Sequence, residues 1–255
     1  AAAPAAAPAA AAAAPLAAAA KTDANYHPPD SFAAPGPNDT PLARTYDVID
    51  AFLRAPDWET RAKYAYRGDS LRPAIEDYHR KWPYQSFDRY APELYTSEND
   101  ASGGPYWVFF ISKSDADDNF LLIVRTEGGN LKVDWDSFVE FHDRHFLRFR
   151  NGTTAPPATF RLIIERLSDY YGSDREAFKD LDDHYVYQVN PPYGELNEFA
   201  EHVFVRKDSA LAGKLNELVK LGEAPLAVII TLDSKPFSHG VKHLVATDII
   251  EGWFR

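Results

Sequence analysis

Residues 121–141, LLIVRTEGGNLKVDWDSFVEF, change their periodicity twice and so set the order of the fold. The apolar run 121–124 is typical of a buried strand, and Gly128 and Gly129 suit a tight hairpin turn. A second strand follows from residue 130. Asp134 then occupies the position of an N-cap for a helix that begins at Trp135. The stretch therefore predicts strand, turn, strand and helix in succession.

Asp134 and Asp136 flank Trp135 and allow two interpretations. If both lay in an enclosed pocket, one raised pKa would make them a general acid–base pair, with His142 as a further polar group. Alternatively, Asp134 caps the helix, and Asp136 lies in the first turn, where negative charge is favoured. We favour the capping interpretation, because it explains both carboxylates and the tryptophan without a substrate.

Helical patterns precede this stretch. Thr40 and Pro41 favour a helix start, and a second helix is predicted from Asp57 to Gly68. A third helix, which we expect Ser70 to cap, carries apolar residues at helical spacing up to Trp82. Aromatic and β-branched runs separated by turns then fill residues 84–133, as in an antiparallel meander.

From about residue 153 a second set of elements follows. The runs 159–167 and 183–190 alternate as strands do, and residues 209–222 form an amphipathic helix capped by Asp208 or Ser209. The predicted fold class is therefore α+β, with three N-terminal helices packed on a curved antiparallel sheet, followed by a second antiparallel sheet with one helix.

Composition divides the chain and excludes several classes of site. We predict an Ala/Pro-rich disordered tether over 1–40, a cone-like α+β domain over 41–152 and a β-rich subdomain over 153–255. A net charge of −11 argues against nucleic acid, and the lack of cysteine excludes thiolate chemistry. We find no P-loop, dinucleotide-binding motif or serine-hydrolase motif, so we predict no cofactor.

The run 48–83, VIDAFLRAPDWETRAKYAYRGDSLRPAIEDYHRKWP, followed by the stretch 121–141, resembles uncharacterised bacterial proteins. Their first half looks like a nuclear transport factor 2-like cone, and an N-terminal membrane helix commonly tethers them. The resemblance covers about residues 41–150. It implies the architecture and a location in the cell envelope or periplasm, with the membrane reached only through a segment upstream of residue 1. A cytoplasmic location is the alternative.

Aromatic residues are dense in the first half of the chain, and cone-shaped sheets often enclose a pocket for a small apolar ligand. Our candidates for its wall are Tyr64, Tyr78, Trp82, Tyr90 and Trp135. The alternative is that these rings fill an ordinary core. His142 and His145 are spaced three apart, but a stable zinc site needs three or four protein ligands, so we predict no metal.

These patterns lack the signature of a catalytic site. We expect a non-catalytic, envelope-associated module that contacts a protein partner, for instance as an accessory subunit of a larger assembly. The alternative is a small-ligand-binding or acid–base enzymatic cone that uses Asp134 and Asp136, with His142 beside them.

Overall fold

The computed structural model describes residues 41–255, except 83, 88–89, 100–104, 114–118, 174, 178, 193–198, 238–239 and 254–255. The described chain is an α+β protein, as the sequence predicts, with helices packed around a four-stranded sheet and a five-stranded barrel. The tether predicted for residues 1–40 and the cap predicted at Thr40 lie outside the described residues. Among the described helices, none has the length and apolar character needed to cross a membrane.

The first half of the fold begins with helices α1 (Pro41–Leu53), α2 (Trp58–Tyr64) and α3 (Gly68–Lys81). The side chain of Asp57 caps α2 by accepting a hydrogen bond from the backbone N–H of Thr60 at 2.7 Å. This confirms the predicted start of the second helix.

The start of α3 corrects the sequence prediction. The helix begins at Gly68, directly after Arg67, whose φ of 56° places it in the left-handed region. Ser70 lies inside the helix, so the predicted Ser70 cap is wrong, and Gly68 does not end the second helix. The physical reason is close packing, since a Cβ at Gly68 would lie 2.0 Å from the carbonyl oxygen of Ala62.

The first sheet is antiparallel, with strand order β1-β2-β3-β4. Its strands are β1 (Tyr90–Asn99), β2 (Pro105–Lys113), β3 (Phe120–Glu127) and β4 (Asn130–Val133). Gly128 and Gly129, both with positive φ, join β3 to β4, so the predicted hairpin is confirmed. The pairing of β1 with β2 shifts register between Leu94 and Thr96, and such a bulge bends a strand.

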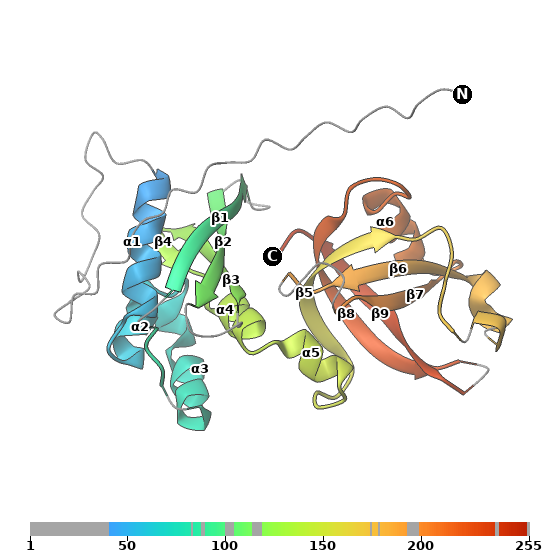
Figure 1. Cartoon of the computed structure of the whole chain (residues 1–255), viewed down its shortest axis with the longest axis horizontal. Coiled ribbons are helices and arrows are strands. Elements are labelled where there is room, and N and C mark those ends of the chain that lie inside the picture. Colours follow the sequence, from blue (N-terminus) through green and yellow to red (C-terminus); the bar gives the residue numbers. More distant parts are fainter. Residues whose placement is uncertain are drawn as a thin grey trace, which may run out of the picture.

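Both faces of the two central strands, β2 and β3, are buried, which explains their nearly continuous apolar sequences. Helices α1 to α3 cover one face, and the barrel lies against the other (Figure 1). The helix side holds Trp107, Phe109, Ile111, Phe120, Leu122 and Val124. The barrel side holds Tyr106, Val108, Leu121 and Ile123, packed with Phe141 and Trp253. The protein is thus three layers of helices, sheet and barrel.

Helices α4 (Trp135–His142) and α5 (His145–Arg150) connect the sheet to the barrel. The barrel strands are β5 (Ala158–Arg166), β6 (His184–Asn190), β7 (Glu201–Arg206), β8 (Leu226–Pro236) and β9 (Lys242–Glu251). Two short 3-10 helices, η1 (Arg175–Ala177) and η2 (Lys179–Asp183), precede β6, and α6 (Ala210–Leu218) lies between β7 and β8. Ser209 caps α6 by accepting from the N–H of Ala212 at 3.1 Å, which confirms one of the two predicted caps.

The second sheet closes on itself, in the order β5-β6-β7-β9-β8. All its pairs are antiparallel except β7 with β9, where Val203 lies opposite Leu244 in a parallel pair. The prediction of a purely antiparallel second sheet is therefore corrected at this pair. A five-stranded Greek-key barrel in this order, with its helix between the third and fourth strands, has the arrangement of an OB fold. Its interior is filled by alternate residues of the strands and by Leu215 and Val219 at α6.

Candidate functional site

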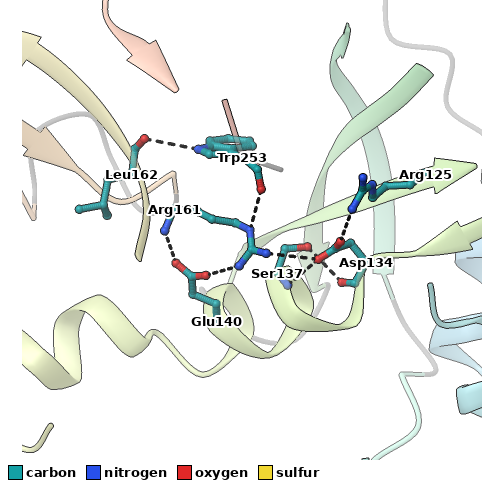
Figure 2. A network of polar contacts seen from close by, with 7 residues as sticks. All are labelled: Arg125, Asp134, Ser137, Glu140, Arg161, Leu162 and Trp253. Carbon is teal, nitrogen blue, oxygen red and sulfur yellow. Dashed lines mark hydrogen bonds and ion pairs between the residues drawn. The ribbon is translucent and has the colours of Figure 1, made fainter. Parts of the chain in front are cut away.

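Asp134 is a structural residue that begins α4. Its carboxylate is only 4% exposed and accepts a hydrogen bond from the N–H of Ser137 at 2.8 Å. It also lies 3.4 Å from the guanidinium of Arg125 and 3.9 Å from that of Arg161 (Figure 2). The capping role predicted from the sequence is confirmed, and the carboxylate is occupied by protein groups.

Asp136 lies in the first turn of α4, as predicted, with an exposed side chain. Burial of part of the carboxyl group, together with the neighbouring Asp134, raises its pKa. Asp136 lines a cavity of about 340 Å³ between the barrel and the half of the fold that holds α1–α4 and the first sheet, which we call the cone. Three arginines share that cavity with Asp134 and Glu140. Two of the arginines, Arg125 and Arg161, already pair with these carboxylates, so this cavity is part of an interface.

Arg161 of β5 connects this interface to the end of the chain. Its Nη1 donates to Glu140 at 2.6 Å, and its backbone N–H donates to the other carboxylate oxygen at 2.5 Å. Its Nε donates to the carbonyl oxygen of Trp253 at 3.1 Å, and the indole N–H of Trp253 donates to Leu162 O at 3.4 Å (Figure 2). Burial raises the pKa of Glu140, and the adjacent guanidinium opposes part of that rise.

A second cavity, of about 130 Å³, lies within the cone and has a different character. It is enclosed by α2, α3, the segment after α3, and the C-terminal end of α4. Its wall consists of Arg61, Tyr78, His79, Trp82, Gln85, Phe87, Phe138, His142 and Asp143. Polar groups thus converge on a small space with aromatic walls, which is the usual composition of a ligand site.

Arg61 is the deepest charged group of this cavity and is only 2% exposed. Its Nε donates to Phe52 O at 3.1 Å, and its Nη2 donates to the carbonyl oxygens of Leu53 at 3.3 Å and Gln85 at 2.5 Å. The guanidinium also lies over the ring of Tyr84, 4.4 Å from the centroid. Burial lowers its pKa to about 10, so it is a cation at neutral pH.

His79 presents polar atoms to the same cavity. Neither ring nitrogen has a hydrogen-bond partner, although both atoms are buried. Its ring lies among aromatic neighbours, 5.3 Å from Tyr84 and 5.8 Å from Trp135 between centroids. Burial, with the nearby Arg61 cation, lowers its pKa to about 4. At neutral pH the uncharged ring therefore offers one donor and one acceptor.

Asp143 is held at the end of α4 by two neighbours. The hydroxyl of Tyr78 donates to both carboxylate oxygens, at 3.0 and 3.1 Å, and Nδ1 of His142 lies 3.0 Å from one of them. Burial alone would raise the pKa of Asp143, but these hydrogen bonds outweigh it and lower the pKa. Asp143 therefore fixes the orientation of the His142 ring, which also stacks on Phe138.

The cavity includes only part of the predicted site. Tyr78, Trp82 and His142 line it, whereas Asp134 and Asp136 do not. Three other candidates belong to the core: Tyr64, Tyr90 and Trp135. Two of the principal polar residues, Arg61 and His79, were not singled out. The sequence does contain a signal for the burial of Arg61. This residue lies three residues after Trp58 and four before Ala65, on the apolar stripe of the helix.

His142 and His145 both approach Asp143, at 3.0 and 3.9 Å. Across the described part of the chain, no group of three or more His, Asp or Glu residues is arranged to hold a metal ion.

Loops of the same chain cover the outer face of β6 and β7 in the barrel. In OB folds, ligands lie across the second and third strands and the loops beside them. Here that face carries Phe204 and Val186, and Tyr170 from the loop before β6 packs on them, leaving each less than a tenth exposed. Phe237 from the loop after β8 joins the same cluster. The candidate site therefore lies in the cone.

No protein-family model matches the chain, and neither the curated proteins nor the solved structures contain a match to it.

Proposed function

We propose that this protein is a non-catalytic binding protein whose cone cavity holds a small polar ligand. The observation that carries the proposal is the His79 ring, with both nitrogens buried against the cavity and without a hydrogen-bond partner. Buried polar atoms in folded proteins are nearly always paired, and leaving one unpaired costs about 1–3 kcal/mol. A ligand that hydrogen-bonds to His79 would account for this arrangement.

The neighbouring residues support the same proposal. Tyr78, Asp143 and His142 form a fixed polar wall, and Phe87 and Phe138 form an apolar one. Trp82 lies at the edge and is 48% exposed, with the guanidinium of Arg148 5.2 Å from its ring centroid. The site is thus preformed on three helices and reaches solvent beside Trp82.

The test uses fluorine NMR of protein labelled with 5-fluorotryptophan. The chain has five tryptophans, and Trp82→Phe assigns the resonance of Trp82. We expect at least one of four probes, propionate, propionamide, 1-propanol or imidazole, to shift this resonance saturably in the wild type. His79→Phe should abolish the shift, whereas His184→Phe in the barrel should retain it. If no probe shifts the resonance, or if His79→Phe responds as the wild type does, the proposal is wrong.

A second candidate function is acid–base catalysis in the same cavity. It is favoured by the contact of Asp143 with Nδ1 of His142, because a carboxylate at that nitrogen orients the ring for proton transfer at Nε2. Turnover of a bound ligand that is lost in His142→Gln, while binding persists, would support it. Unchanged turnover in that variant would contradict it.

The wider setting of the protein stays a proposal. We infer a protein partner, an envelope location and kinship with nuclear transport factor 2-like cones from the sequence resemblance and from the Ala/Pro-rich composition of residues 1–40. The packing of three helices on one face of a bent sheet supports the kinship.

A further inference from the structure

Arg61 is a buried cation without a carboxylate partner. Among the described residues, no Asp or Glu lies within ion-pairing distance of its guanidinium, and its hydrogen bonds use Nε and Nη2 only. Carbonyl oxygens and aromatic faces stabilise the cation, but they carry no net charge to neutralise it. The Nη1 group retains two N–H donors for another acceptor.

The one carboxylate of the cavity wall does not supply this neutralisation. Asp143 accepts the Tyr78 hydroxyl and contacts Nδ1 of His142, so its oxygens are engaged by these two residues and not by Arg61. His79, with a pKa near 4, carries no charge at neutral pH. The space between Arg61 and His79 therefore favours an anion.

Size and wall chemistry narrow the class of anion. A cavity of about 130 Å³ has the volume of roughly four water molecules, at about 30 Å³ each. Phe87 and Phe138 offer an apolar surface beside the charged group. One buried guanidinium suits one negative charge, whereas a phosphate dianion would need further donors.

We propose that the cavity binds a small organic acid, with its carboxylate on Nη1 of Arg61, its apolar carbons against Phe87 and Phe138, and a further hydrogen bond to His79. This inference rests on the proposed function and names the class of its ligand. The carboxylate replaces water as the partner of a cation in a largely apolar site, where a charge-assisted hydrogen bond is strong.

The decisive comparison uses the wild-type protein and two probes of equal shape. Propionate and propionamide are titrated at constant ionic strength, with sodium chloride as the balancing salt and the Trp82 fluorine resonance as the readout. We expect propionate to bind at least tenfold more tightly than propionamide, because only propionate carries the charge. Sodium phosphate and sodium chloride alone should give no saturable shift.

One variant tests the contact of the ligand with Arg61, and a second serves as its control. Arg61→Lys should weaken propionate about tenfold or more, since an ammonium cannot reproduce the planar guanidinium. Arg72→Lys, an exposed change in α3, is the matched control and should leave the affinity unchanged. Because a change at buried Arg61 can disturb folding, the wild-type comparison decides the proposal by itself.

The two proposals fail in different ways. If propionamide or 1-propanol binds as tightly as propionate, the cavity is a ligand site but not a carboxylate site, and this inference alone is overturned. If phosphate binds more tightly than propionate, the cavity does bind an anion, but its assignment to small organic acids is wrong. If no probe moves the Trp82 resonance, both proposals are overturned.

Discussion

Nη1 of Arg161 in the barrel donates to the carboxylate of Glu140 in α4 at 2.6 Å, and this pair joins the cone to the barrel. The two side chains are 17% and 10% exposed. A pair this well buried is costly to separate, because either partner alone becomes a buried charge without a counter-ion. The pair therefore ties α4 to β5.

Removing one member of the pair should destabilise the protein strongly. We expect Arg161→Ala to lower the free energy of unfolding by about 3–5 kcal/mol, whereas the double variant Arg161→Met, Glu140→Leu should recover most of that loss. Urea denaturation followed by tryptophan fluorescence is the measurement, and Trp253, whose carbonyl oxygen accepts from Arg161, contributes to that signal. Equal losses in the single and double variants would contradict the expectation.

The two aspartates beside Trp135 should respond differently to substitution. Asp134→Ala removes the α4 cap and the buried ion pair with Arg125, so we expect a loss of about 2–4 kcal/mol. Asp134→Asn keeps the cap and should cost less. Asp136→Asn, at an exposed position, should change stability by about 0.5 kcal/mol or less. Thermal and urea denaturation of the three variants give the order, and a larger loss at Asp136 would refute it.

Substitution of two helical glycines by alanine should change the free energy of unfolding in opposite directions. Gly68→Ala places a Cβ 2.0 Å from Ala62 O and should destabilise the protein by about 1–3 kcal/mol. At Gly213, inside α6, a Cβ meets nothing within 4 Å. Gly213→Ala should therefore stabilise by about 0.5–1 kcal/mol, because alanine is the better helix former. Urea denaturation measures both, and effects of the same sign would contradict the packing at Gly68.

The buried His79 should make stability depend on pH. Its folded-state pKa is about 4, against about 6.5 for an unfolded histidine, so the unfolded chain takes up the proton first as the pH falls. The stabilising contribution of the neutral His79 ring is complete above pH 6.5 and is lost progressively as the pH falls toward 4. Between pH 7 and pH 4, the free energy of unfolding of His79→Phe should therefore rise relative to that of the wild type by roughly 1–2 kcal/mol. This is less than the full pKa shift implies, because the cavity reaches solvent. A difference that stays constant over this range would exclude a neutral buried imidazole.

Local chemistry allowed much of the fold to be predicted. Side chains that cap helices act within three residues, so Asp57, Asp134 and Ser209 could be recognised from the sequence. The strand alternation of Phe160 and Leu162 identified the inward face of the barrel without identifying the neighbouring strands. Closure depends on pairs such as Phe160 with Ile230, far apart in the chain, and no local pattern encodes them.

The candidate site was only partly predictable for the same reason. Tyr78, Trp82 and His142 could be recognised as candidates by residue type. The position of Arg61 on the apolar stripe of a short helix does not indicate what its guanidinium contacts. Its burial depends on carbonyl oxygens of Phe52 and Gln85, which other segments supply. The lack of hydrogen-bond partners at His79 is a property of the packed structure, and no local sequence pattern encodes it.

Helix α4 serves as a common wall for both cavities. Phe138 and His142 face the small one, and Glu140, two residues from each and so on the other side of the helix, faces the barrel. One short helix therefore borders both the small cavity and the contact with the barrel, so a change in its position would alter the two together.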